Sequence, residues 1–297
     1  MSSIERIADK MIHIYDDGIK RAQWYFGSRT HDFYLYGVGE LLDVVRQYPF
    51  IDMQTKPVGT LVKRGEPAIV VTINSNELLQ YGNMIETLIY NRIWYASTVG
   101  TILHNMRDHL HSNGFDVYRA FPQMGRASVN EHQTKVASDI FSRVFYKLND
   151  SLRSVATHNE ILMTSETFCI ENYHSVMADT YDIREFCKLA NSLNYSGEIM
   201  VDSKPIIDNI EYVLSETPNT VCQVESVTRE EWYDIVTHFS GNERVLFGIG
   251  SCCFTNVNRD TLGFVYKTCA IHRGDEWIAV SKQTKNKETF SGYVEEL

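Results

Sequence analysis

Short apolar runs alternate with helical periodicities through the second half of the chain. The pattern predicts strands at residues 197–201, 221–224 and 245–250, and amphipathic helices at residues 136–152, 183–193, 206–214 and 229–239. Strand–helix pairs that recur at a spacing of roughly 20–30 residues are typical of parallel α/β sheets, either open or closed into a barrel. We therefore expect a parallel α/β arrangement that binds ligands at the carboxyl ends of its strands.

The first part of the chain shows a different pattern. The apolar, β-branched residues 68–73 predict a strand, and apolar residues at helical spacing predict a helical region from residue 78 to residue 111. Asn113-Gly114 ends this helical region. We therefore expect an α+β region over residues 1–113, whose helical segment leads into an α/β region over residues 114–297.

Composition and charge narrow the class of protein. The 297 residues are 43% hydrophobic, which suffices for a sizeable core and excludes wholesale disorder. The 28 Lys and Arg residues against 38 Asp and Glu residues give a formal net charge of −10, which disfavours nucleic acid and anionic membranes as partners. The apolar stretches are too short for a membrane helix, and the acids near the start do not fit a signal peptide. We expect a cytoplasmic protein.

The cysteines and histidines form no metal-binding pattern. The six cysteines include no Cys-x-x-Cys pair, and the ten histidines form no His-x-His or His-Glu-x-x-His motif. We expect reduced, buried thiols and no metal site built by the chain itself. A nucleophilic thiol in Ser251-Cys252-Cys253 is the less favoured alternative, because no nearby histidine is indicated that would activate it.

Polar residues occur at four predicted strand ends of the parallel sheet, which is where a ligand would bind. These residues are Asp179 with Asp182, Asp202 with Ser203, Glu225 with Ser226, and Gly250 with Ser251. Carboxylates at successive strand ends can hold the hydroxyls of a sugar or a magnesium–phosphate complex. The alternative at each position is that the residue caps the following helix. The four positions together favour a ligand-binding rim.

The glycine turn at Gly250 and a basic stretch after it indicate an anion site. Backbone amides at a glycine turn before a helix bind phosphate because they are unpaired and lie at the positive end of the helix dipole. Residues 259–287 contain six basic residues against three acids, although the chain as a whole is acidic. Arg259 and Lys267 would supply full positive charges, and the alternative is an ordinary solvated surface.

Several segments also form an ordered series of motifs. The series runs Tyr25-Phe26-Gly27-Ser28-Arg29, Ile85-Glu86-Thr87, Trp94-Tyr95-Ala96-Ser97-Thr98-Val99, Asp179-Thr180-Tyr181-Asp182-Ile183, Ile199-Met200-Val201-Asp202-Ser203 and Phe247-Gly248-Ile249-Gly250-Ser251. It resembles the nicotinamide phosphoribosyltransferase family, within the nicotinate and nicotinamide type II phosphoribosyltransferases. The resemblance implies an α/β fold, an irregular type II phosphoribosyltransferase α/β barrel over residues 114–297 with a smaller α+β N-terminal domain.

The resemblance also implies a reaction and a set of site residues. The reaction transfers phosphoribose from phosphoribosyl pyrophosphate, bound with Mg²⁺, to nicotinamide, in NAD biosynthesis and within a homodimer. The residues that correspond to catalytic positions, holding the ribose hydroxyls or the metal-bound diphosphate, are Asp202, Glu225 and Asp179. The residues that correspond to substrate-binding positions are Gly250, Ser251, Arg259 and Lys267 for the 5′-phosphate, Asp150 for the carboxamide, and Phe121 and Arg126 around the base and phosphates.

The chain departs from the family pattern at positions that matter for catalysis. Met200 stands where the motif has an arginine, and Glu166-Thr167 stands where the family has its catalytic Glu-His-Ser, so that the histidine is missing. One hypothesis is a compact nicotinamide phosphoribosyltransferase. A second is a phosphoribosyltransferase-like protein without catalysis that serves as a binding, regulatory or assembly subunit. A third keeps the enzyme and changes the base to nicotinate or another heterocycle.

Overall fold

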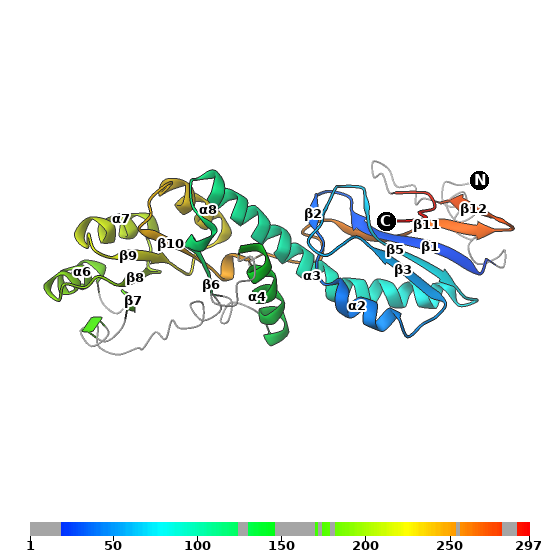
Figure 1. The fold of residues 1–297 in the computed structure, drawn as a ribbon, viewed down its shortest axis with the longest axis horizontal. Helices are drawn as coiled ribbons and strands as arrows, with labels where there is room; N and C mark the ends of the chain where they lie inside the picture. Colours follow the sequence, from blue (N-terminus) through cyan, green and yellow to red (C-terminus); the bar gives the residue numbers. More distant parts are fainter. Residues whose placement is uncertain are drawn as a thin grey trace, which may run out of the picture. The chain divides into compact units, whose positions relative to one another are not determined.

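The computed structural model describes residues 19–123, 130–145, 170–171, 174–178, 182–253, 256–280 and 290–297. The chain divides into two compact units (Figure 1), each with a large sheet of its own. Unit 1 consists of Met1–Thr101 together with Val257–Leu297, and unit 2 consists of Ile102–Asn256.

Unit 1 is built on an antiparallel sheet of five strands in the order β12-β11-β1-β5-β3. The strands are β1 (Arg21–Ser28), β3 (Ile51–Thr55), β5 (Pro67–Asn74), β11 (Phe264–Arg273) and β12 (Glu276–Ala279). A short separate ladder pairs β2 (Phe33–Tyr34) with β4 (Leu61–Val62). Unit 1 also contains α2 (Val38–Val45) and α3 (Leu78–Ser112), the latter as far as Thr101.

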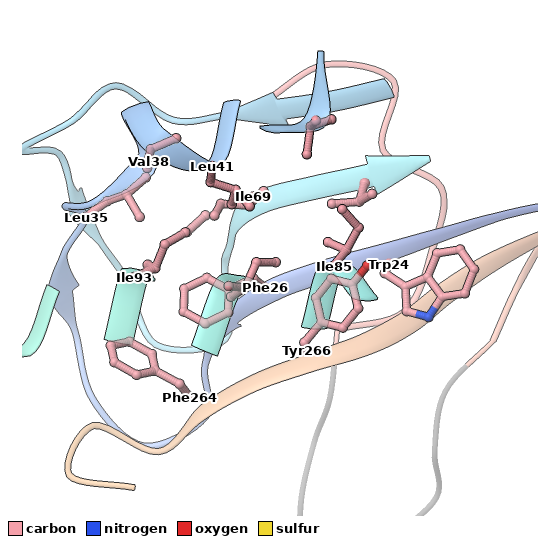
Figure 2. Close-up of a cluster of buried hydrophobic side chains, with 14 of the residues drawn as sticks. Trp24, Phe26, Leu35, Val38, Leu41, Ile69, Ile85, Ile93, Phe264 and Tyr266 are labelled. Atoms are coloured by element: carbon pink, nitrogen blue, oxygen red, sulfur yellow. The ribbon is translucent and has the colours of Figure 1, made fainter. Parts of the chain in front are cut away.

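An aromatic core lies between one face of this sheet and the two helices (Figure 2). Phe26 of β1 packs against Phe264 of β11, with ring centroids 5.1 Å apart. The facing stripe of α3 consists of Ile85, Ile89 and Ile93, which are all fully buried. Their spacing of four residues is the helical periodicity that predicted this helix, and the prediction is confirmed.

Unit 2 contains a parallel sheet of five strands in the order β6-β10-β9-β8-β7. The strands are β6 (Ala120–Pro122), β7 (Ser175–Met177), β8 (Glu198–Val201), β9 (Val221–Val224) and β10 (Val245–Ile249). The helices are α4 (Glu131–Phe145), α6 (Ile183–Ser192), α7 (Ile206–Glu216) and α8 (Arg229–His238), with the short η1 (Val117–Arg119) before β6. The first strand, β6, pairs with the last, β10, and this is the strand order of an α/β barrel. Among the described residues, the sheet is open between β6 and β7.

Arg244 holds the end of α7 next to the start of β10. Its guanidinium donates to the carbonyl oxygens of Leu214, Thr217 and Thr220 at 2.9, 2.7 and 3.0 Å. The last carbonyls of a helix have no partner within the helix, and a charged donor satisfies them well. The orientation of α7 against the sheet therefore depends in part on this one side chain.

The division between the units differs from the predicted boundary at residue 113. Strand β11 pairs with β1 along its length, from Ala22 opposite Ile271 to Ser28 opposite Phe264, so that residues 257–297 belong to unit 1 and not to the α/β region. The other boundary falls inside α3, before the glycine break. Among the described residues, no helix is both long and apolar enough to cross a membrane.

We expect Gly100→Ala to destabilise unit 1. A Cβ at Gly100 of α3 would overlap the ring of Tyr36, which is 5% exposed and has little room to move. Overpacking of this kind costs about 1–3 kcal/mol, to be measured as the free energy of unfolding in urea.

Gly39→Ala is the matched control. Gly39 lies in α2 with no atom within 4 Å of an added Cβ, so that the gain in helix propensity should stabilise the protein by about 0.5–1 kcal/mol. If the two variants had the same stability, the proposed packing of Tyr36 on Gly100 would be wrong.

A second prediction concerns acid. Burial lowers the pKa of His104 in α3 to about 4, whereas an unfolded histidine titrates near 6.5. Because the folded-state pKa is the lower one, its contribution to stability is complete above about pH 6.5 and is lost as the pH falls towards 4. The unfolding free energy of the wild type should therefore fall over this range by about 2–3 kcal/mol more than that of His104→Gln, as measured by urea titrations. If the unfolding free energies of the wild type and His104→Gln had the same pH dependence, the lowered pKa of His104 would be wrong.

Candidate active site

The parallel register of unit 2 aligns the residues that follow its strands. One row across four strands consists of Ala120, Phe247, Val224 and Val201. The next residues along the four strands are Phe121, Gly248, Glu225 and Asp202. Neighbouring strands lie about 4.8 Å apart, so that the backbones of Asp202 and Glu225 are adjacent at the carboxyl edge of the sheet.

Two carboxylates therefore come together where the sequence predicted a ligand-binding rim. Glu225 is 5% exposed, and its amide donates to the carbonyl oxygen of Val201 at 3.1 Å, which continues the β8–β9 pairing beyond the strand ends. Asp202 is half-buried, and its carboxylate accepts a hydrogen bond from Ser203 at 3.5 Å. The backbones of the two acidic residues are therefore neighbours at this edge.

Of the described acidic residues of the predicted rim, Asp182 is a helix cap, whereas Asp202 and Glu225 are not. Asp182 caps α6 by accepting a hydrogen bond from the amide of Arg184 at 2.7 Å. In contrast, the N-cap residue of α7 is Pro205, and that of α8 is Thr228, which forms a capping box with Glu231. Asp202 and Glu225 therefore do not cap the helices that follow them.

Glycines allow β6 and β10 to approach closely at the same edge. A Cβ at Gly248 would overlap the side-chain amide of Gln123 and lie 2.6 Å from the carbonyl oxygen of Val224. A Cβ at Gly250 would lie 2.7 Å from the carbonyl oxygen of Gln123, whose amide donates to Ile249 at 2.9 Å. Gln123 thus lies in the site although the sequence analysis did not select it, and its only signal was its position two residues after Phe121.

The glycine turn continues into a short 3-10 helix, η4 (Ser251–Cys253). The amide of Cys253 donates to the carbonyl oxygen of Gly250 at 3.0 Å, and Arg229 of α8 donates to that of Cys252 at 3.0 Å. In the described part of the chain, this turn stands in place of the helix N-terminus that we expected to bind phosphate. The backbone of the turn is therefore fixed by one hydrogen bond within the turn and one from α8.

The two adjacent cysteines are part of this short helix. Cys252 is 1% exposed and Cys253 is fully buried, as the sequence predicted, and both are free. The hydrogen bond from Cys253, assisted by the guanidinium of Arg229, lowers the pKa of the Cys252 thiol, whereas burial raises that of Cys253. Their burial favours a structural role for the pair.

The two cations that were expected to contact phosphate belong to unit 1. Arg259 lies over the ring of Tyr90, 5.0 Å from its centroid, and also contacts Asp260 at 3.4 Å. Lys267 is half-buried on β11, opposite Tyr25 in the pairing with β1. The structure therefore places Lys267 on the antiparallel sheet, Arg259 in the turn before β11, and the two carboxylates directly after strands of the parallel sheet.

Three further predicted residues, Asp150, Asp179 and Arg126, lie outside the described residues. Near Asp202, the cation of Lys204 forms an ion pair with Glu231, and this hydrogen bond lowers the pKa of the Glu231 carboxyl. Lys204 thereby connects the loop after β8 to the start of α8.

The chemistry of this edge suits a sugar phosphate. Carboxylates accept hydrogen bonds from vicinal hydroxyls, and Mg²⁺ is commonly held by one or two carboxylates together with substrate phosphates. The described residues contain no group of three or more potential metal ligands.

Comparison with solved structures defines the class to which this fold belongs. Nicotinate-nucleotide pyrophosphorylase from Pyrococcus furiosus superposes with a TM-score of 0.66 at 12% identity, covering 99% of this chain and 78% of that chain. Human nicotinic acid phosphoribosyltransferase superposes with a TM-score of 0.55 at 14% identity, covering 90% and 74%. The fold is that of the type II phosphoribosyltransferases, as the sequence predicted.

Sequence comparison gives the family. A profile of the nicotinate phosphoribosyltransferase (NAPRTase) family matches residues 96–291, more than half of the chain, and the chain belongs to this family. A stretch of 41 residues is 54% identical to nicotinamide phosphoribosyltransferase from Mycoplasma genitalium and 51% identical to that from Mycoplasma pneumoniae. This stretch is 14% of the chain but only 9% of the length of either relative.

We expect Gly248→Ala to disrupt the site by forcing β6 and β10 apart. The added methyl group has no space between Gln123 and the Val224 carbonyl, and the cost should be about 1–3 kcal/mol of unfolding free energy. Removing the Gln123 side chain in Gln123→Ala/Gly248→Ala should restore only part of this loss, because the backbone clash remains. Full restoration by the double substitution would contradict the close approach of the Val224 carbonyl.

Proposed function

We propose that this protein is a phosphoribosyltransferase of NAD biosynthesis that transfers phosphoribose from phosphoribosyl pyrophosphate to nicotinamide, with release of pyrophosphate. The observation that carries the proposal is the placement of Asp202 and Glu225 in one row at the carboxyl edge of the parallel sheet, next to Gly248. The membership of the chain in the NAPRTase family supports it.

The physical demands of this reaction match the two carboxylates. C1 of the ribose becomes cationic as pyrophosphate leaves, and fixed negative charge close to the sugar stabilises that state more than the ground state. Asp202 and Glu225 would hold the ribose hydroxyls or the Mg²⁺ that accompanies the diphosphate, and Asp179 would support them. Gly250 and Ser251 would receive the 5′-phosphate.

The remaining predicted residues have proposed roles in binding. Arg259 and Lys267 would neutralise phosphate charge, and Arg126 and Phe121 would surround the base and phosphates. Asp150 would accept a hydrogen bond from the carboxamide of nicotinamide and repel the carboxylate of nicotinate. The match to the two Mycoplasma nicotinamide phosphoribosyltransferases supports nicotinamide as the base, and the family profile keeps nicotinate as the alternative.

The assembly and location that we propose follow the same resemblance. A homodimer is the form that the resemblance implies. The described cysteines are free and buried, which fits the reducing conditions of the cytoplasm.

The second candidate function is a binding protein that has lost catalysis. Met200, where the resemblance has an arginine, is 1% exposed and lies in a row with Met177 and Gln223. The row two residues before Asp202 and Glu225 is therefore uncharged, and this particular cation is missing from that row. In this case the protein would bind phosphoribosyl pyrophosphate without transferring it.

The test is the conversion of isotope-labelled nicotinamide to its mononucleotide in the presence of phosphoribosyl pyrophosphate and Mg²⁺. We expect product from the wild type, and a loss of at least about 100-fold in kcat/KM for Asp202→Asn and for Glu225→Gln, because an amide supplies no negative charge to the cationic sugar. Asp234→Asn, on the exposed face of α8, is the matched control and should keep full activity.

The outcomes separate the candidates. Product from labelled nicotinate in place of nicotinamide would keep the enzyme and change its base. A rise in Tm with phosphoribosyl pyrophosphate but no product from either base would support the binding protein. If no product formed and phosphoribosyl pyrophosphate caused no change in Tm, both proposed functions would be overturned.

A further inference from the structure

The segment Phe290–Leu297 lies on the face of the unit 1 sheet opposite the aromatic core. In β1, Trp24 and Phe26 belong to that core, whereas Tyr25 between them belongs to a second cluster with Phe290 and Val294. Exposure alternates along the segment, with residues 290, 292 and 294 half-buried and residues 291, 293 and 295 exposed. This period of two indicates an extended peptide with one face against the sheet.

Gln23 binds the backbone of this segment with both ends of its side-chain amide. Its Nε2 donates to the carbonyl oxygen of Val294 at 2.9 Å, and its Oε1 accepts from the amide of Val294 at 2.8 Å. The same Nε2 donates to the hydroxyl of Thr72 at 3.1 Å, and Gln23 is 1% exposed. A buried amide thus satisfies both main-chain groups of one residue, as a neighbouring strand would.

Three more main-chain contacts fix the position of the segment along the sheet. The amide of Phe290 donates to the hydroxyl of Tyr25 at 3.2 Å, and that of Gly292 donates to the carbonyl oxygen of Cys269 at 3.0 Å. At the far end, Gln54 donates to the carbonyl oxygen of Glu295 at 2.9 Å. Together with the Gln23 contacts, they involve residues 290, 292, 294 and 295 and come from β1, β11 and β3.

The side chains of the segment are also recognised. The ring of Phe290 packs edge-on against Tyr25 with centroids 5.4 Å apart, and that of Tyr293 stacks on Trp277 at 4.5 Å. Gly292 has φ +134°, in the range that favours glycine. Val294 packs into the second cluster. The segment therefore presents an aromatic residue, a glycine, a second aromatic residue and an aliphatic residue to the sheet at fixed spacing.

We propose that this face of unit 1 is a sequence-reading peptide-binding surface whose occupant is the chain's own segment Phe290–Leu297. The recognition combines a side-chain amide clamp on the peptide backbone with the pattern Phe-x-Gly-Tyr-Val. Phe290 packs against Tyr25, and Tyr25 is paired across β1 and β11 with Lys267, which was predicted to bind phosphate. The inference does not depend on the proposed function.

The test uses the full chain with a specific protease site introduced between Val280 and Phe290. After cleavage, the fragment should remain bound through gel filtration. A fluorescent synthetic peptide of residues 290–297 should then replace it saturably, as measured by anisotropy. In the intact chain, where the tethered segment is at high effective concentration, the same peptide should bind at least tenfold more weakly.

Variants of the peptide leave the folding of the chain untouched. Gly292→Ala should weaken binding by about fivefold or more because of its positive φ, and Val294→Ala by a similar factor because it removes buried methyl groups. Ser291→Ala, at an exposed position, is the control and should bind within about twofold of the parent peptide.

The proposal would be overturned if the labelled peptide failed to bind the cleaved chain. It would also be overturned if the Gly292→Ala and Val294→Ala peptides bound as tightly as the Ser291→Ala peptide, since the surface would then hold the segment without reading it.

Discussion

Parallel pairing in register between β8, β9 and β10 is the constraint on which the candidate site depends. Val201, Val224 and Phe247 share one row, and therefore the residues that follow them share the next. A slip of one residue in a strand would turn its side chains to the opposite face and separate Glu225 from Asp202. The hydrogen bond from the amide of Glu225 to Val201 carries this register past the strand ends, to the position where ligands bind.

The candidate site places an acidic residue after each of two adjacent strands. Glu225 is 5% exposed, and burial disfavours the charged form of a carboxyl group. At the same edge, Arg229 donates to the carbonyl oxygen of Cys252, whereas Arg244 binds its three carbonyl oxygens at the end of α7, beside the start of β10. A ligand that brings positive charge to the carboxyl edge would offset the cost of the buried Glu225 carboxylate, and the ligand that we propose is a magnesium-bound sugar diphosphate.

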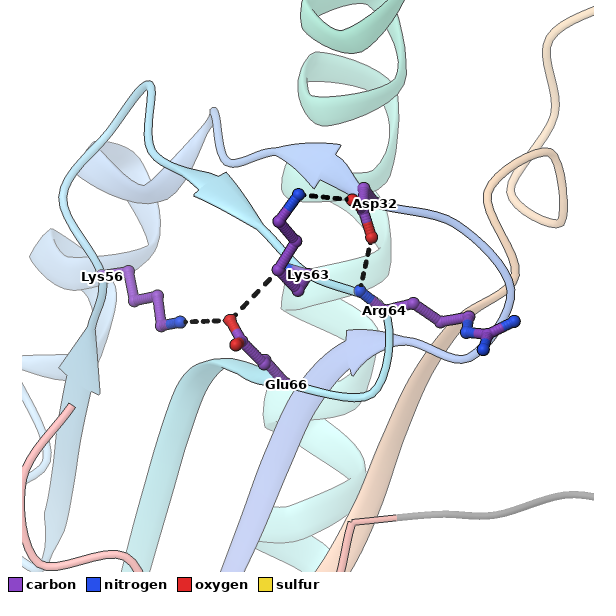
Figure 3. Close-up of polar contacts among 5 residues, drawn as sticks. All are labelled: Asp32, Lys56, Lys63, Arg64 and Glu66. Atoms are coloured by element: carbon purple, nitrogen blue, oxygen red, sulfur yellow. Dashed lines mark hydrogen bonds and ion pairs between the residues drawn. The ribbon is translucent and has the colours of Figure 1, made fainter.

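Unit 1 follows a different design, in which both faces of one sheet are covered. Helices α2 and α3 cover the aromatic face, and the segment Phe290–Leu297 lies on the other. Several of its polar interactions are exposed, as in the turn before β5 (Figure 3), where Lys63 and the amide of Arg64 both bind Asp32 at 2.8 Å and Lys56 binds Glu66 at 2.9 Å. The hydrogen bond from Lys63 lowers the pKa of the Asp32 carboxyl. Exposed pairs of this kind contribute little to stability, so that unit 1 is held together chiefly by its core.

The sequence by itself determined several elements of unit 2 and the position of two acidic residues after its strands, because helical and strand periodicities and polar residues after strands are local signals. It predicted α6, α7 and α8 and singled out Asp202 and Glu225, and the family resemblance supplied their roles. Only the tertiary structure decided what distant residues do together. The pairing of β11 with β1 moved Arg259 and Lys267 to the other unit, and the close approach of β6 to β10 brought Gln123 against Gly248. These two strand pairings have no local sequence signature. They depend on which strands become neighbours, and this is decided by the burial of apolar surface from distant parts of the chain.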